Sequence, residues 1–355
     1  MKRKITALLR KRPGHRPEPE KSLEEAIQDI PRITNETVAE HREEVLSSAR
    51  KYIYPLQHSL RRIVTVSVSI FAVLLIGLFV YCGLALYKFG ATSTFIYRVT
   101  QVLPFPVARS CGQFVSYESY LFELRHYMHY YETQQKIDFN SASGKQQLSA
   151  FRKIALQSVM DQACIKKLAA QHHVTVSAQA IQAEVTLLRD QNRLGTNNTI
   201  FADVLKDFWG WSIADFTREL KNQMIAQKVV STLDTTTHQR AENVLDQMKN
   251  GVSFASLASQ YSDDASTKNN GGDYGFDISK NSRDLAPQVV DALFKLKTGE
   301  TSGVIETPVG LEIVQVHEQN SVSVRASHIY FAFHSISDYI APLEAKQKPH
   351  AYIND

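Results

Sequence analysis

The sequence predicts an α+β protein that combines a single transmembrane helix, a helical module and a smaller domain with a short sheet. Three observations support this fold class. An uncharged apolar run extends from Ile63 to Tyr87. Apolar residues repeat at helical spacing between about 116 and 233. Two β-rich runs, 309–316 and 322–333, follow near the C-terminus.

Changes in composition along the chain divide it into six predicted segments. They are a basic cytoplasmic tail (1–62), a transmembrane helix (63–87), a linker (88–104), a helical module (105–235), a mixed domain of helices and strands (236–334) and a C-terminal tail (335–355). Hydrophobic residues make up 43% of the chain and charged residues 21%, which is typical of folded rather than disordered protein.

The overall charge excludes a generally basic nucleic-acid binder. Lys and Arg number 40 against 36 Asp and Glu, so the formal net charge is only +4. Such a surplus is too small to neutralise many phosphates. The three cysteines are too few for a disulfide scaffold and lack the spacing of a zinc site. We therefore expect no nucleic-acid partner, no metal and no cofactor.

The run from Ile63 to Tyr87 is long enough to cross roughly 30 Å of hydrocarbon as a helix. The alternative, a buried core helix, rarely extends so far. Alternating β-branched residues at its start would favour a strand in water. Lipid, however, requires each segment to satisfy its own backbone hydrogen bonds, so a helix is expected.

Positive charge is concentrated before this run. Residues 1–62 hold 14 basic and 9 acidic side chains, a net of +5, whereas the remainder holds 26 and 27, a net of −1. The positive-inside rule predicts a single-pass cell-membrane protein with a cytoplasmic N-terminus, extracytoplasmic residues 88–355 and lipid contact through the anchor. The basic arm at 2–16 is either a lipid- or nucleic-acid-binding segment or a topology signal with a disordered tail, and we favour the second.

Cap residues and apolar periodicity mark the helices of the module. The predicted helices are 116–131 with Ser116 as N-cap, 145–172, a third capped by Ser177, and one from a capping box of Ser212 and Asp215 to about Leu233.

Cys111 and Cys164 lie outside the membrane in this topology, where a disulfide is permitted. Cys111 is near a predicted turn and Cys164 is within a helix, and a bridge needs the two to meet within a short distance. We expect two unpaired thiols, and an inert Cys82 within the span.

A series of motifs follows in the mixed domain: GVSFASLASQYSDD, GGDYG, LAPQVVDALFKL, GETSGV and GLEIVQV. Together they resemble the parvulin family of peptidyl-prolyl isomerases over about 80 residues. The preceding segment, with FVSYESYLFEL and WGWSIADFTREL, looks like the N-terminal chaperone region of SurA- and PrsA-type foldases. The resemblance implies a four-stranded antiparallel sheet with helices.

The same resemblance implies a set of site residues. Asp264, in SDDAS, matches an acidic or Cys position that faces two histidines in the family. Leu285, Val289 and Tyr274 match substrate-binding positions of the proline pocket, and Val289 stands where the family usually has Phe. Glu312 stands where the last strand usually carries a histidine.

The family's first strand, which carries the other histidine, is missing before Arg240. Residues 324–331, VRASHIYF, have its pattern but follow the last strand. A second parvulin domain is excluded because only 24 residues remain after Phe331. We therefore predict a circularly permuted domain in which strand 324–331 pairs with strand 309–316.

The predicted pairing brings a histidine to the site. If Val316 pairs with Val324 across a loop of 317–323, Glu312 lies directly opposite His328 on one face of the sheet. His328 is then either a catalytic residue beside Asp264 and Glu312 or a merely packed histidine.

The C-terminal tail is expected to return to the helical module. Residues 335–346 can form a short helix, and residues 351–353 can pair with an edge strand. The resemblance to foldases that build this module from both chain ends implies the same arrangement here.

Two functions of different classes remain. The first is a membrane-anchored extracytoplasmic foldase that isomerises peptidyl-prolyl bonds in unfolded or proline-containing polypeptides and acts as a chaperone. The second is a non-catalytic holdase or scaffold with the parvulin fold. Asp264, GGDYG and His328 favour activity, whereas Glu312, Val289 and the absent upstream strand favour the non-catalytic alternative.

Overall fold

The computed structural model describes residues 33–53, 56–191, 194 and 197–353, so the basic arm at 2–16 lies outside the described residues. The chain divides into two compact units, Met1–Phe79 and Val80–Asp355.

The helices are α2 (Asn35–Ile53), α3 (Leu56–Tyr87), α4 (Thr94–Val102), α5 (Tyr117–Thr133), α6 (Ala142–Gln171), α7 (Ala178–Gln191), α8 (Asn198–Trp209), α9 (Ile213–Leu233), α10 (Thr235–Lys249), α11 (Phe254–Tyr261), α12 (Pro287–Leu293) and α13 (Ile336–Lys346). The strands are β1 (Pro106–Ser110), β2 (Gln113–Ser116), β3 (Ile278–Ser279), β4 (Ile305–Thr307), β5 (Gly310–Gln319), β6 (Ser323–Ala332) and β7 (His350–Ala351).

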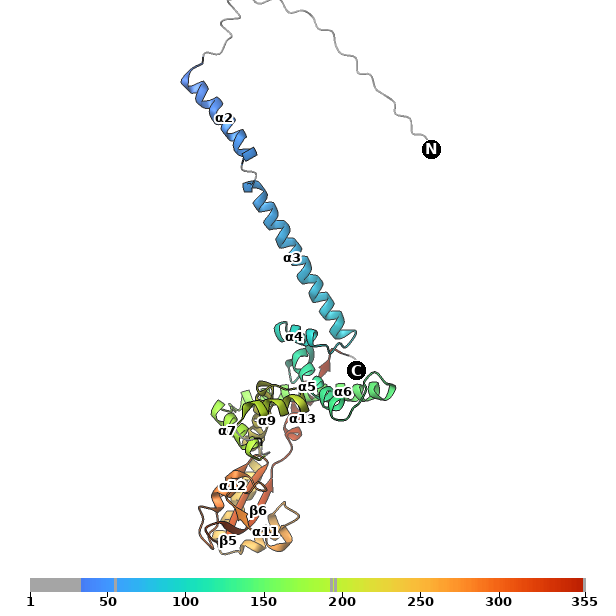
Figure 1. The fold of residues 1–355 in the computed structure, drawn as a ribbon. Helices are drawn as coiled ribbons and strands as arrows, with labels where there is room; N and C mark the ends of the chain where they lie inside the picture. The colour runs from blue at the N-terminus through green and yellow to red at the C-terminus, as the bar shows by residue number, and fades with distance from the viewer. Residues whose placement is uncertain (1–32, 54–55, 192–193, 195–196, 354–355) are drawn as a thin grey trace, which may run out of the picture. The chain divides into compact units, whose positions relative to one another are not determined.

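The apolar run forms one continuous helix, α3 (Figure 1). Within its segment Arg62–Tyr87, the most apolar window of 18 residues has a mean hydropathy of 2.8 and is 0% buried. Among the described residues it is the one helix long and apolar enough to cross a membrane, by length and composition.

Residues 88–104 hold a helix rather than an extended linker. Helix α4 begins after Ser93, whose side chain accepts a hydrogen bond from the main-chain N–H of Ile96. Ile96 and Thr100 are buried, and Ile96 contributes to the same apolar cluster as α5 and α6. The amphipathic spacing within 94–102 is the reason that this short segment folds.

Helices α5 and α9 begin at the expected caps, whereas α6 begins at Ala142, three residues before its predicted start. Ser116 caps α5 through the N–H of Ser119, and Ser212 forms a reciprocal capping box with Asp215 at the start of α9. Gly210 ends α8 in the left-handed region, at φ +68. The tyrosine-rich face of α5 packs on α6 in a cluster that includes Tyr117, Leu121 and Phe151.

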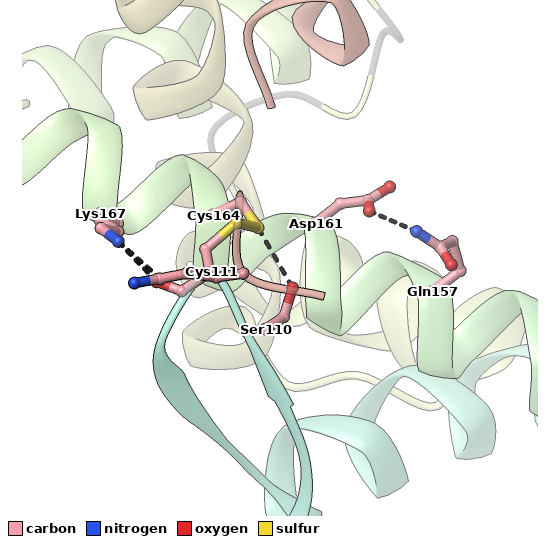
Figure 2. Close-up of a disulfide and its surroundings, with 7 residues drawn as sticks. Ser110, Cys111, Gln157, Asp161, Cys164 and Lys167 are labelled. Carbon is pink, nitrogen blue, oxygen red and sulfur yellow. Dashed lines mark hydrogen bonds between the residues drawn. A yellow bond between two sulfur atoms is a disulfide. The ribbon is translucent and has the colours of Figure 1, made fainter. Parts of the chain in front are cut away.

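The expectation of two unpaired thiols is wrong: Cys111 and Cys164 form a disulfide (Figure 2). Cys111 adopts the left-handed region, at φ 49, in the tight turn between β1 and β2, and this turn places its Cα 5.3 Å from that of Cys164 on α6. Lys167 also donates to the carbonyl oxygen of Cys111, at 2.7 Å. A bridge across a sequence separation of 53 stabilises the fold by about 4 kcal/mol in the loop-entropy account.

The C-terminal segment lies within the helical module. Helix α13 buries Ile340 in a cluster with the disulfide, Leu168 and Val229. Strand β7 pairs with β1, with Ala351 opposite Ala108, in a small sheet of order β2-β1-β7.

The second sheet has the order β3-β6-β5-β4, with antiparallel neighbours throughout. Strand β6 is therefore interior although it is the last strand of this sheet along the chain, and it lies beside β5 (Figure 1). This confirms the predicted pairing of 324–331 with 309–316. Helices α10 and α11 cover one face, where Ile313 and Phe331 are buried, and α12 covers the other, where Val314 and Ala326 are buried.

The predicted register is wrong by two residues. His328 pairs with Val314, and Glu312 pairs with Tyr330. The hairpin is longer than expected, because β5 continues to Gln319 through a bulge between Val316 and Glu318. A shift of two keeps every side chain on its face, so Glu312 and His328 still share a face but are diagonal neighbours and not directly opposed.

Strand β6 should be indispensable to this sheet, because its removal leaves β3 and β5 without their shared partner. Deleting residues 322–355 should abolish hydrogen-exchange protection of the β5 amides. Deleting only 336–355 removes the same tail but keeps β6, and should preserve that protection. Protected β5 amides in the longer deletion would show that the sheet forms without β6.

Candidate active site

A cleft of about 770 Å³ opens on the face of the sheet that carries α12. Its lining brings together five of the six residues that the sequence singled out: Asp264, Tyr274, Leu285, Glu312 and His328. They come from four separate segments: the loop after α11, the GGDYG turn, the loop before α12, and the β5–β6 pair.

His328 lies between two carboxylates. Its Nε2 is 2.9 Å from Oδ2 of Asp264, and its Nδ1 is 3.2 Å from Oε2 of Glu312. Because a carboxylate can only accept, each contact is a hydrogen bond when that nitrogen carries a proton. The His328 side chain is only 9% exposed, so the ring is held in one orientation by partners on both sides.

Hydrogen bonds stabilise the ionised form of Asp264. Its carboxylate accepts from the N–H of Ser266 at 3.0 Å, from the hydroxyl of Ser266 at 2.7 Å and from that of Thr267. Burial opposes ionisation, but the bonds from Thr267, Ser266 and His328 outweigh it and lower the pKa of Asp264. Sequence reasoning missed Thr267, whose hydroxyl also lies 2.9 Å from Nε2 of His328. Its position three residues after an Asp in a polar loop was the available signal.

Tyr274 connects the second carboxylate to the ring. Its hydroxyl donates to Glu312 at 2.9 Å, and its ring centroid is 4.2 Å from that of His328. Burial, followed by the neighbouring charge of Glu312, raises the pKa of Tyr274, so the phenol stays protonated and remains a donor.

A glycine allows the GGDYG turn to lie against β6. Gly272 has φ +82, and a Cβ there would come 2.2 Å from the carbonyl oxygen of His328. The two segments are also joined by a main-chain hydrogen bond, because the N–H of His328 donates to the carbonyl oxygen of Gly272 at 2.8 Å. The motif therefore fixes Tyr274 beside His328 by direct backbone contact.

The apolar wall of the cleft differs in one respect from expectation. Leu285 and Tyr274 line the cleft together with Phe276 and Pro308. Val289 does not: it is fully buried among Ile278, Leu293 and other residues between α12 and the sheet. It is the third residue of α12, and the residues of this helix that line the cleft are the two before it, Pro287 and Gln288.

Two sequence families match the chain. Residues 57–230 match the SurA-like N-terminal domain, and residues 215–320 match the PPIC-type PPIase domain. The chain therefore joins a SurA-like N-terminal domain to a peptidyl-prolyl isomerase domain of the PPIC (parvulin) type. The second match ends before β6, so the strand that supplies His328 lies beyond it.

Two relatives that the chain matches are named as a foldase and a chaperone. The chain is 27% identical over 189 residues to foldase protein PrsA of Caldanaerobacter subterraneus, covering 48% of this chain and 58% of that protein. It is 39% identical over 92 residues to chaperone SurA of Methylobacillus flagellatus, covering 26% of this chain and 20% of that protein. The crystal structure of PrsA from Bacillus subtilis aligns over 57% of this chain and 79% of that chain, with 19% identity and a TM-score of 0.21. The chain thus spans from 20% to 58% of the length of these two curated relatives.

Asp264 should stabilise the fold in a pH-dependent way. Because its folded-state pKa is lowered, its contribution is complete above the unfolded value of about 3.9 and is lost as the pH falls through the folded value. Asp264→Asn should lower the thermal midpoint by a few degrees at pH 7 and by less at pH 3. The exposed carboxylate variant Asp291→Asn, outside the cleft, should change the midpoint little. An Asp264→Asn deficit of equal size at both pH values would contradict an ionised, hydrogen-bonded Asp264.

Proposed function

We propose that this protein is a membrane-anchored extracytoplasmic foldase whose cleft isomerises peptidyl-prolyl bonds of unfolded polypeptides. One observation carries the proposal: within a PPIC-type domain, His328 is held between Asp264 and Glu312 beside an apolar wall. The combination suits a substrate that has an apolar ring next to a polar amide.

The reaction needs no nucleophile and no cofactor. The substrate amide must rotate about a bond whose barrier is roughly 18–20 kcal/mol, because conjugation gives it partial double-bond character. Rotation ends this conjugation and returns electron density from the carbonyl oxygen to the proline nitrogen. A site lowers the barrier by binding the twisted amide better than the planar one.

Each part of the cleft has a role in that task. Leu285 and Tyr274 bind the proline ring and keep water from the amide. His328, held by Asp264 and Glu312, belongs to a fixed set of polar groups beside the apolar wall, so little reorganisation is needed as charge redistributes during rotation. Thr267 and Ser266 are positioning residues, since they act through Asp264.

Three features support an extracytoplasmic location for the residues that follow α3. Helix α3 can span a bilayer, basic residues exceed acidic ones before it and not after it, and the domain beyond it contains a disulfide. Disulfides persist in oxidising compartments, so the third feature supports an extracytoplasmic location independently of charge. Lipid contact is made by the anchor.

A non-catalytic holdase is the second candidate, and Glu312 favours it. A carboxylate at this position in place of histidine leaves His328 between two anions, and both of its nitrogens are engaged. In that case the cleft would bind proline segments without accelerating their rotation.

His328→Ala in the full chain, held in uncharged detergent, should lower kcat/KM for an Ala-Ala-Pro-Phe peptide by roughly 10- to 100-fold. Nuclear magnetic resonance exchange between the cis and trans peptide measures the rate without a coupling protease. His317→Ala removes an exposed histidine from the same hairpin and should retain activity. Full activity in His328→Ala would exclude this site, and binding without catalysis by the wild type would identify the holdase.

Topology is tested by thiol labelling of intact spheroplasts in a Cys82→Ala background. A membrane-impermeant maleimide should label Lys280→Cys, because that exposed position is extracytoplasmic in the proposed orientation. His15→Cys should react only after permeabilisation. Labelling of His15→Cys in intact spheroplasts would contradict the orientation.

A further inference from the structure

We propose that the cleft selects proline segments that carry Lys or Arg next to the proline and disfavours those with Asp or Glu there. This inference names the substrate class of the proposed isomerase site and rests on that function.

Acidic side chains dominate the lining. Five carboxylates border the cleft, whereas one cationic side chain, Arg283, does so among the described residues. The carboxylates are Glu184, Asp263, Asp264, Asp284 and Glu312.

The internal partners offset only part of this charge. Asp263 is paired with Arg240 through bonds of 2.8 and 3.1 Å. Asp264 and Glu312 share the single imidazole of His328, so even a charged ring balances only one of them. Arg283 donates to the main-chain carbonyl of Gln191 at 3.0 Å rather than to a carboxylate.

Two carboxylates have no hydrogen bond or ion pair within the described part of the chain. Asp284 directly precedes Leu285 of the apolar wall and is exposed, and Glu184 borders the cleft from α7. Both are therefore available to a ligand. A carboxylate adjacent to the proline-binding wall is well placed to meet the side chain next to the proline.

Lys and Arg fit this combination of wall and charge. Their aliphatic stems can lie along Leu285 and Phe276 while the charged head reaches a carboxylate. An exposed ion pair contributes about two- to fivefold in affinity, and an acidic side chain in the same place suffers repulsion of similar size. Discrimination between Lys and Glu should therefore reach about tenfold.

The test compares peptides of the form Ala-X-Pro-Phe with X as Lys, Ala or Glu, by exchange spectroscopy with the full chain in uncharged detergent. At about 10 mM ionic strength kcat/KM should fall in the order Lys, Ala, Glu, with about tenfold between the extremes. At 1 M salt, where the screening length is about 3 Å, the ratio should approach one.

Variants locate the source of the preference. Asp284→Asn should reduce the Lys-to-Glu ratio about two- to fivefold, and Asp284→Asn with Glu184→Gln should reduce it further. Asp291→Asn removes an exposed carboxylate of α12 outside the cleft and should leave the ratio unchanged. A ratio that Asp284→Asn and the double variant both leave intact would overturn the assignment.

Failure of this inference can be distinguished from failure of the proposed function. Equal kcat/KM for the Lys and Glu peptides, with the Ala peptide turned over, would overturn the charge preference and leave the isomerase standing. If no peptide is turned over, the isomerase fails, and line broadening of the same peptides still measures their relative affinities. Tighter binding of the Lys peptide would then support the preference, and equal binding would overturn it.

Discussion

The pairing of β6 with β5 and β3 is the interaction on which the rest of the domain depends. This one strand completes the sheet, contributes Ile329 and Phe331 to the core beneath α10 and α11, and places His328 on the opposite face. It also binds the GGDYG turn through a hydrogen bond from the main-chain N–H of His328 to the carbonyl oxygen of Gly272. The same strand pairing therefore forms the sheet and positions the site, so loss of the pairing would also disrupt the site.

An interior strand at the end of the domain's sequence also links the domain to the helical module. The chain enters the domain between α9 and α10 and leaves it between β6 and α13. Asp234 links these two connecting segments. Its buried carboxylate accepts a hydrogen bond from the N–H of His334 at 2.8 Å, and it caps α10 by accepting from the N–H of Thr237. Helix α13 and β7 then pack on α6 and β1, so the C-terminal segment is part of the helical module.

Local signals in the sequence were sufficient for much of this structure. Ser116 and the Ser212–Asp215 box cap helices by rules that act over three residues, and alternation in β5 and β6 placed Glu312 and His328 on one face. Features set by distant geometry were not predictable. Pairing that continues past a bulge to Gln319 moved the register by two, the turn at Cys111 brought a thiol to α6, and the packing of α12 turned Val289 into the core.

The central claim is that the cleft around His328 binds the proline of a polypeptide. Its most direct test is a titration of the full chain, with 13C-labelled histidines, by an Ala-Lys-Pro-Phe peptide followed through the histidine ring resonances. The account predicts that the His328 signal shifts or broadens saturably, whereas those of His317 and His350 do not. An unchanged His328 resonance in the presence of bound peptide would contradict it.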